Sequence, residues 1–463
     1  MKNILKTTFA LFFAVLISTG CENFLTPSVD QAKPIDDAIT SVDDLQSFIY
    51  GMHSELNNTA LFGRELTVSP DVMSDNAFSN GNSGRFIDQS MFQFTSNNAG
   101  HAGGLWDNFY QIIANANIVI NFDEIEGSAR ENHIKGQAYA LRALSHFYLT
   151  LNFGQQWLSA GSDLGVPIIT TYNDGNLIPA RNTVTEVMAA VVSDLETAAG
   201  LMDPSFDTST ELIGYYAVKA LQSRVYLYTG DFDAAITAAD EVIDDAGYTL
   251  VDSANLVSTW NGGVPNAIFA LGYDIADRTG NNSITRIYTA TNYGDVEATA
   301  DLYNAYDAAD ARLQLLTFTG TDEYRMTGKF VDELGQDDVP VVRYAEVLLN
   351  KAEALSRRGG ASDLVEAAAI INNISSTRGS ATVYATGSVT NVLAERRLEL
   401  AMEGHRFFDL ARHGMDIPNV TVPSRGNNFN GGDDLPYGDY RYALPIPQAE
   451  IDANSSMVQN PEY

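Results

Sequence analysis

The densest group of side chains suited to acid–base chemistry lies in one segment, LAERRLELAMEGHRFFDLARHG, at residues 393–414. Within fifteen residues it holds Glu395, Glu399, Glu403, His405, Arg406 and Asp409. Glycoside hydrolysis needs a pair of carboxyl groups in a cleft, one of them with a raised pKa. Here, however, charges of opposite sign alternate at helical spacings, which is typical of side chains that pair with one another. We therefore interpret the segment as a structural ion-pair network and keep catalysis as the alternative.

The sequence offers few residues at the spacings that bind metals or cofactors. The chain has six histidines without the paired spacing of a zinc site, at positions 53, 101, 133, 146, 405 and 413. The segment DVMSDNAFSNGN offers oxygens from Asp71, Asp75, Asn76 and Asn80, but not at the spacing of a calcium loop. No P-loop, G-x-G-x-x-G or G-x-S-x-G motif occurs. We expect no cofactor, except for a structural calcium ion as a weak signal, and no enzyme.

The only cysteine, Cys21, follows a segment that reads as an export signal. Lys2 and Lys6 precede an apolar run that is too short to span a membrane, and small residues follow it. A cysteine after such residues is similar to a bacterial lipobox, although Ser18 stands where leucine is usual. The sequence predicts a lipoprotein signal peptide over residues 1–20 and lipidation of Cys21. The alternative is an ordinary secretory signal with a chance cysteine.

The composition limits which classes of molecule can bind to the protein. The net charge is −32 with 27 lysines and arginines against 59 acidic residues. Such a surface repels nucleic acid and anionic lipid headgroups, and disfavours a polyanionic ligand. No apolar run of membrane-spanning length follows Cys21. We expect a polypeptide attached to the membrane only through its lipid anchor.

The elements that must position any site read as helices joined by long loops. Apolar residues recur at three- and four-residue steps over residues 106–125, 133–154, 184–202, 215–244 and 342–360. The third begins after Asn182 and Thr183, either of which would cap it, and the fourth is interrupted at Gly230. The stretch YLYTGDFDAA is similar to the turn of a tetratricopeptide helix pair. This pattern predicts an all-α fold of tetratricopeptide-like helix pairs that form a scaffold, with long loops and a few short strands.

Three long loops, at residues 64–104, 252–300 and 415–442, carry aromatic, Asn, Asp and Arg side chains suited to sugars. The candidate ligand-binding residues are Asp75, Phe78, Asn80, Asn82, Arg85, Trp260, Tyr273, Arg278, Asn282, Tyr288 and Tyr293. As a hypothesis, Phe78, Tyr288 and Tyr293 form a stacking platform flanked by Asp75, Asn80 and Arg278. The alternative for each ring is that it anchors its loop to the scaffold. This applies most to Trp260, which precedes the alternating apolar run NAIFALGYD, a possible buried strand. Trp106 lies on a helical face and is expected in the core.

Several stretches in a fixed order resemble the SusD/RagB family of surface lipoproteins, which capture glycans for a SusC-type TonB-dependent transporter. They are CENFLTP, YQIIANANIVI, GQAYALRALSHFYLTLNFG, RYAEVLLNKAEAL, ERRLELAMEGHRFFDLARHG and YALPIPQAEIDANSSMVQNPEY. The resemblance implies one domain over residues 21–463, with an N-terminal half of about 21–250 and a C-terminal half of about 265–463. It also implies lipid-anchored display at the outer membrane, a glycan ligand, a transporter partner and no catalysis. It fixes no ligand residues.

Two other functions remain open from the residues alone. One is a lipid-anchored glycoside hydrolase, which requires a carboxylate pair in a cleft. The other is a peptide-binding surface receptor or scaffold, because stacked helix pairs commonly bind peptides on a concave face. Cleavage, binding without cleavage, or neither, on exposure to polysaccharides would separate the three.

Overall fold

The computed structural model describes residues 39–97, 100–159, 161–172, 178–290, 293–423, 426–427 and 432–463. The predicted signal peptide and Cys21 lie outside these residues. Within the described ranges, no helix combines the length and apolar character needed to cross a membrane.

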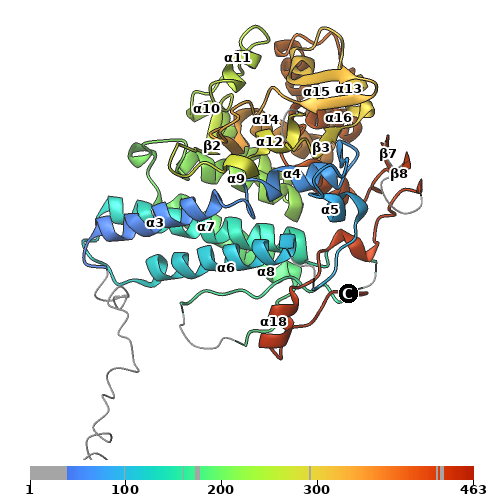
Figure 1. Ribbon diagram of the computed structural model, residues 1–463. Coiled ribbons are helices and arrows are strands. Elements are labelled where there is room, and N and C mark those ends of the chain that lie inside the picture. The colour runs from blue at the N-terminus through green and yellow to red at the C-terminus, as the bar shows by residue number, and fades with distance from the viewer. Residues whose placement is uncertain are drawn as a thin grey trace, which may run out of the picture.

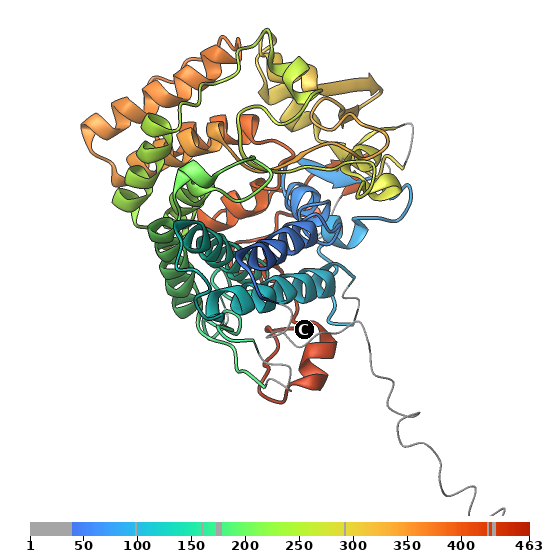
Figure 2. The same cartoon turned by 90° about the vertical axis from the view of Figure 1, so that its left-hand side faces the viewer.

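Helix pairs form the body of the molecule (Figures 1 and 2). Successive helices pack on one another through the N-terminal part and then into the C-terminal part. They are α3 (Val42–Leu56), α6 (Gly100–Asn121), α7 (Ala129–Phe153), α8 (Val184–Leu201), α9 (Tyr215–Thr229), α10 (Phe232–Asp245), α14 (Tyr344–Arg358), α15 (Ala361–Thr377) and α16 (Val389–Glu399). The predicted all-α fold with tetratricopeptide-like pairs is confirmed.

Local sequence signals set the ends of these helices. Thr183 caps α8, since its side chain accepts a hydrogen bond from the Glu186 N–H and the Glu186 carboxylate accepts from the Thr183 N–H. Gly230 separates α9 from α10 with a φ of 79°, and Gly359 separates α14 from α15 with a φ of 78°. This left-handed conformation suits glycine, which has no Cβ to clash. The break predicted at Gly230 is confirmed.

The three predicted loops contain more regular structure than the sequence indicates. The first holds α4 (Glu65–Val72), β1 (Ala77–Ser79) and α5 (Ile87–Met91). The second holds α11 (Leu256–Trp260), β2 (Ala267–Leu271), η3 (Gly280–Asn282), α12 (Ile284–Tyr288) and β3 (Val296–Ala298). The third holds β7 (Thr421–Val422), β8 (Gly426–Asn427) and η6 (Tyr440–Tyr442). These elements are too short to show a periodic pattern in the sequence. They form because partners that are distant in the sequence stabilise them.

The strands of the described residues form three small antiparallel sheets, the smallest of which is the pair β7-β8. A four-stranded sheet has the order β1-β3-β5-β4 and adds β4 (Leu316–Gly320) and β5 (Glu323–Met326). β2 pairs with β6 (Val339–Arg343), which confirms the buried strand expected in NAIFALGYD. The remaining short elements are η2 (Pro204–Phe206), α13 (Ala300–Ala305), η4 (Ala311–Leu315), α17 (Arg406–Arg412) and α18 (Gln448–Ala453). The four-stranded sheet and α18 lie at opposite ends of the molecule (Figures 1 and 2).

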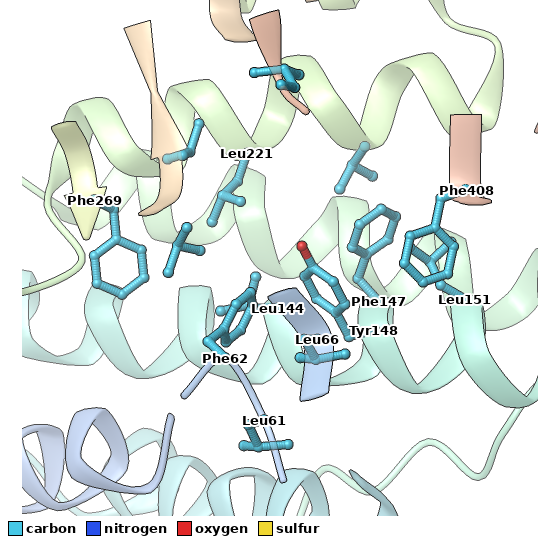
Figure 3. Close-up of a cluster of buried hydrophobic side chains, with 14 of the residues drawn as sticks. Leu61, Phe62, Leu66, Leu144, Phe147, Tyr148, Leu151, Leu221, Phe269 and Phe408 are labelled. Atoms are coloured by element: carbon cyan, nitrogen blue, oxygen red, sulfur yellow. The ribbon is translucent and has the colours of Figure 1, made fainter. Parts of the chain in front are cut away.

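One large apolar core joins the N-terminal and C-terminal parts. Figure 3 shows Leu144, Phe147 and Tyr148 of α7 facing Leu221 of α9 and Phe408 of α17. Trp106 is 3% exposed in this core, as expected. Because side chains from both parts interdigitate here, the loops of both parts are held on a single rigid support.

The charged segment at residues 393–414 is an ion-pair network, as interpreted. The buried Glu399 carboxylate contacts Arg312 at 3.0 Å, Arg343 at 2.7 Å and Arg378 at 2.7 Å. Burial alone would raise the pKa of Glu399, but the Arg378 and Arg343 guanidinium groups hold it well below its usual range. Two further pairs extend the network, Lys329 with Glu403 and Arg396 with Asp409.

Glu395 is the member of this network with the pKa profile of a catalytic acid. Burial raises its pKa, but its side chain is bonded to Arg312 at 2.6 Å and to the Tyr384 hydroxyl at 2.9 Å. The residue is 0% exposed. A substrate therefore has no access to this carboxyl group in the folded chain.

Candidate functional site

Two loops distant in sequence meet at the end of β1. The Asn80 N–H donates to the Asp295 carbonyl at 2.9 Å, and its side chain donates to the Gly294 carbonyl at 2.7 Å. The Asn82 side chain donates to the Tyr293 carbonyl at 2.5 Å. These bonds continue the β1–β3 pairing beyond the strands. They bring together residues more than 200 positions apart.

Arg85 links the two loops through its guanidinium group. The group lies 4.0 Å from the centre of the Tyr293 ring, in cation–π contact. It donates to the Asn282 side-chain oxygen at 3.3 Å and lies 3.7 Å from the buried Asp295 carboxylate. Arg64 donates to the same Asn282 oxygen at 3.3 Å. We call Asn80, Asn82, Arg85, Asn282 and Tyr293 the loop cluster.

The loop cluster offers solvent-facing groups on a fixed base. Asn82 and Asn282 are exposed, whereas Asn80, Arg85 and Tyr293 are half-buried. An aromatic ring, amide groups and a guanidinium are the side-chain types that bind sugars, through their C–H faces and hydroxyls. The arrangement is suited to binding, and it includes no free carboxylate pair for hydrolysis.

Residues of the four-stranded sheet bond to the two loops that carry the loop cluster. Arg325 of β5 donates to the Gly294 carbonyl at 2.8 Å and pairs with Glu297 of β3 at 3.2 Å. Asn80 donates to the same Glu297 carboxylate at 2.6 Å. Gly294 has a φ of 52°, and a Cβ there would lie 3.0 Å from the Arg325 guanidinium. Glycine is therefore needed where the two loops close on the sheet.

The predicted three-ring platform is wrong in two of its members. Phe78 is 3% exposed and packs against Val420 and Val422, and Tyr288 is 0% exposed and packs near Phe330. Neither ring presents a face to a ligand. Both residues lie in short elements that bury them, β1 and α12, so they hold the scaffold together. Of the three rings, Tyr293 alone reaches the surface.

Other candidates also have structural partners. Asp75 forms a two-bond ion pair with Arg406, at 2.6 and 2.8 Å. Trp260 is 3% exposed, with the Lys329 ammonium 5.2 Å from its ring, which confirms the reading of Trp260 as an anchor. The Tyr273 hydroxyl donates to the Asn57 carbonyl at 2.9 Å.

Arg278 remains exposed on the neighbouring loop, outside the loop cluster. Its backbone N–H donates to the Asp274 carbonyl at 3.0 Å. Ile275 on the same loop is 72% exposed.

The carboxylates of the segment DVMSDNAFSNGN, for which a structural calcium ion is the weak expectation, accept hydrogen bonds from protein donors. The Asp71 carboxylate accepts from the backbone N–H groups of Met402 and Gly404 and from the Asn76 side chain. Asp75 is paired with Arg406. Among the described residues, no three His, Cys, Asp or Glu side chains are grouped as metal ligands. These carboxylates fix the segment after α4 to the C-terminal part.

A further aromatic group was missed in the sequence. Tyr303, Phe318 and Tyr324 lie with ring centres 4.7 to 6.5 Å apart, and Phe318 is 51% exposed. Phe318 and Tyr324 pair across β4 and β5, on the sheet face opposite Glu297. The signal that indicates this hairpin is the alternation in LTFTG before a turn at Asp322, which has a φ of 57°.

Comparisons with known proteins agree with this architecture. A model described as the SusD family matches residues 316–463, and one described as starch-binding and associating with the outer membrane matches residues 23–227. A SusD-like protein of Formosa agariphila is 25% identical over 99% of both chains. The starch-binding protein SusD of Bacteroides thetaiotaomicron is 30% identical over 34% of this chain and 28% of its own.

Solved structures extend the likeness to nearly the whole fold. A putative sugar binding protein of Bacteroides vulgatus superposes with a TM-score of 0.83 at 29% identity, over 92% of this chain and 99% of that one. A SusD superfamily protein of Bacteroides thetaiotaomicron superposes with a TM-score of 0.81 at 28% identity, over 91% and 100%. Helix pairs, sheet and sequence motifs together show that the chain belongs to the SusD family.

Proposed function

We propose that this protein is a cell-surface lipoprotein that captures an oligosaccharide or polysaccharide and delivers it to a SusC-like TonB-dependent transporter. The observation that carries the proposal is the loop cluster. Its Tyr293 ring is held by Arg85 and surrounded by exposed amide groups, in a chain whose family includes a starch-binding protein.

The chemistry of the loop cluster favours a sugar over a peptide. A sugar ring has a C–H face that packs on an aromatic ring, and its hydroxyls both donate and accept hydrogen bonds. The exposed Asn82 and Asn282 side chains can do both, and the Arg85 guanidinium can donate. A peptide receptor of this fold would instead need a groove with apolar pockets or a free strand edge.

Binding without cleavage is supported by the state of the carboxylates. Glu395, Glu399, Glu403 and Asp409 are buried and bonded to basic side chains. The carboxylates beside the loop cluster, Asp295 and Glu297, are buried as well. A hydrolase would need one protonated and one ionised carboxyl group facing the same bond.

Delivery to a transporter is the part of the proposal that rests on the resemblance to the SusD family alone. The family model described as associating with the outer membrane supports a location at that membrane. Attachment through a lipid on Cys21 completes the proposal.

Incubating the protein with a panel of neutral and acidic polysaccharides tests the proposal. We expect retardation in affinity gels by at least one of them, with no new reducing ends. New reducing ends would indicate the hydrolase instead. Failure to bind any polysaccharide, in a sample that melts cooperatively, would contradict glycan capture and favour the peptide receptor.

A further inference from the structure

A pocket lies between α3, the first half of α7 and the segment at residues 203–214. Its volume is about 250 Å³, and its lining includes Gln46, Tyr50, His133, Gln137, Phe206 and Asp207. This volume is far above the roughly 30 Å³ of one water molecule, and below the ~300–1,000 Å³ of pockets for drug-sized ligands. The pocket is thus suited to a single small unit.

Three polar atoms that line this pocket are buried without a hydrogen-bond partner in the part of the chain that the structure describes. They are Gln46 Nε2, Gln137 Oε1 and Asp207 Oδ1. Gln137 is only 4% exposed. A buried polar group without a partner costs about 1–3 kcal/mol of stability, so three around one space are unusual. Their convergence indicates a site built to be completed by a ligand.

The surrounding hydrogen bonds fix what each group can do. Gln137 Nε2 donates to the Ile213 carbonyl at 3.0 Å, which leaves Oε1 as an acceptor toward the pocket. His133 Nδ1 accepts from the Asp203 N–H at 3.3 Å, so its Nε2 carries the hydrogen and lies 3.5 Å from Asp207 Oδ1. Asp207 Oδ2 accepts from the Tyr215 N–H at 3.0 Å. The pocket therefore presents two acceptors beside two donors.

We propose that this pocket is a binding site for one neutral, hydroxyl-rich unit, a monosaccharide residue or a polyol of the same size. A hydroxyl donates and accepts at once, so neighbouring hydroxyls can satisfy Asp207 and Gln137 as well as Gln46 and His133. An ammonium group only donates and would leave Gln46 without a partner. An anion would meet the Asp207 carboxylate, whose only basic neighbour within ion-pair distance among the described residues is His133, whereas Arg130, which also lines the pocket, pairs with Asp43 at 2.6 Å.

The state of Asp207 agrees with a neutral ligand. Burial is the main cause that raises the pKa of this carboxyl group to about 6, and the nearby Asp203 raises it further, against the Tyr215 N–H, which lowers it. Burial also lowers the pKa of His133, so the imidazole is neutral at pH 7.5. Hydroxyl donors would stabilise the ionised carboxylate that this site leaves unpaired.

Two rings border the pocket and suit the face of a sugar. Tyr50 on α3 is 54% exposed, and Phe206 packs with its ring centre 5.6 Å from that of His133. Aromatic rings bind the C–H faces of sugars while polar groups take the hydroxyls. A ring and a polar set on one small pocket fit a chain end or a single branch residue of a glycan.

The pocket is separate from the loop cluster. In Figure 1, α3 lies at the left of the molecule and α5, next to the loop cluster, lies at the right. The ligand class follows from the pocket's own donors and acceptors and does not rest on the proposed function. The two sites can therefore fail independently in an experiment.

Calorimetric titration with D-glucose, D-galactose, D-mannose and D-xylose at pH 7.5, with D-glucuronate as the anionic comparison, tests this site. We expect saturable binding of at least one neutral sugar and weaker binding of D-glucuronate. Asp207→Asn should lower the affinity for that sugar about tenfold or more, because a hydrogen bond to a charged acceptor becomes a weaker one. Tyr437→Ala, at an exposed ring outside both sites, should leave it unchanged, and the same titration of Tyr293→Ala separates this pocket from the loop cluster.

Gln46→Ala is the second variant, because Gln46 is half-buried and its truncation spares the core. It should also weaken binding, with a melting temperature like that of the parent. The inference is overturned if none of the four neutral sugars binds. It is equally overturned if Asp207→Asn and Gln46→Ala both bind like the parent, or if Tyr293→Ala alone abolishes monosaccharide binding.

Discussion

Arg85 decides the shape of the loop cluster, because one planar group contacts both loops. It stacks on Tyr293 at 4.0 Å and donates to Asn282 at 3.3 Å. A lysine would keep the charge but lose the fork that reaches the amide oxygen while covering the ring. The residue thus positions the tyrosine as well as being available to the ligand.

Tyr288 has a structural role, but burial of its hydroxyl group lowers the stability of the fold. The residue is 0% exposed, and its hydroxyl has no hydrogen-bond partner within the described ranges. Tyr288→Phe should raise the free energy of unfolding by about 1 kcal/mol, since an unsatisfied buried group is removed. Tyr288→Ala should lower it by about 3–5 kcal/mol through the cavity it leaves. Urea unfolding measures both.

One outcome would contradict the structural role of Tyr288. If Tyr288→Ala unfolds at the same urea concentration as the parent and loses glycan binding, the ring contacts ligand and its burial is misassigned. Tyr437→Ala, at a ring that is 39% exposed, serves as the control for a mild truncation.

The sequence indicates which loop side chains are chemically suited to bind a sugar, but it does not show which of them are exposed. Asn80, Arg85, Asn282 and Tyr293 are among the individual candidates, and the fold brings them together, whereas their contact with a ligand stays a prediction. Phe78 has the same chemistry but faces Val420 and Val422 from the third loop. That contact depends on how β7 meets β1, which no local pattern in the sequence records.

At the scale of elements, α16 buries charged side chains as well as apolar ones. Glu395, Arg396 and Glu399 on this helix are all buried. Glu399 alone bonds to guanidinium groups from η4, β6 and the end of α15. Removing one partner from such a set leaves several charges buried without compensation.

Glu399→Gln should therefore lower the free energy of unfolding by about 3–5 kcal/mol. Glu366→Gln is the matched control, because Glu366 on α15 pairs with Lys351 but its side chain is 49% exposed. The control should change stability by less than about 1 kcal/mol. Equal losses for the two variants, measured by chemical unfolding, would contradict the role assigned to the network.

The long helices could be predicted from apolar periodicity and capping residues, and the alternating charges correctly indicated ion pairs. The short elements could not. β1 has three residues and pairs only with β3 among the described residues, with Ala77 opposite Ala298 and Ser79 opposite Val296. A strand of that length has no stability of its own and forms because the partner exists.

At the scale of the molecule, buried histidines make stability depend on pH. Burial lowers the pKa of His53 to about 4, of His146 to about 3 and of His405 to about 4. The unfolded chain binds these protons near pH 6.5, so stability is complete above that pH and falls as the pH drops toward 4. Burial raises the pKa of Asp71 and Asp207 to about 6, which acts in the opposite direction.

A variant isolates the contribution of His53. Its ring contacts the Ile49 carbonyl at 2.8 Å and accepts from the Ile213 N–H at 2.9 Å, and a glutamine can keep both kinds of bond. Between pH 7 and 4.5, His53→Gln should lose less unfolding free energy than the parent, by up to about 3 kcal/mol. Unfolding curves at five pH values measure this. Parallel pH profiles for variant and parent would contradict a neutral buried His53.

Attachment to the membrane is tested at Cys21, which lies outside the described residues. Cys21→Ala should leave the fold intact but abolish membrane association, since acyl chains contribute about 0.8 kcal/mol per buried methylene. Labelling of cells with radioactive palmitate, followed by fractionation, checks this. Label on Cys21→Ala, or its recovery with membranes, would contradict the lipid anchor.

The most direct test of the central claim is calorimetric titration of the glycan that the polysaccharide panel identifies into the parent, Tyr293→Ala and Arg85→Ala. The matched controls are Tyr437→Ala and Arg358→Ala, at an exposed ring and at an exposed arginine on α14. We predict that each loop-cluster variant loses about 1–3 kcal/mol of binding, a five- to hundredfold loss in affinity, and that Tyr293→Ala keeps the melting temperature of the parent. Parent-like affinity in both loop-cluster variants would contradict glycan capture at this site.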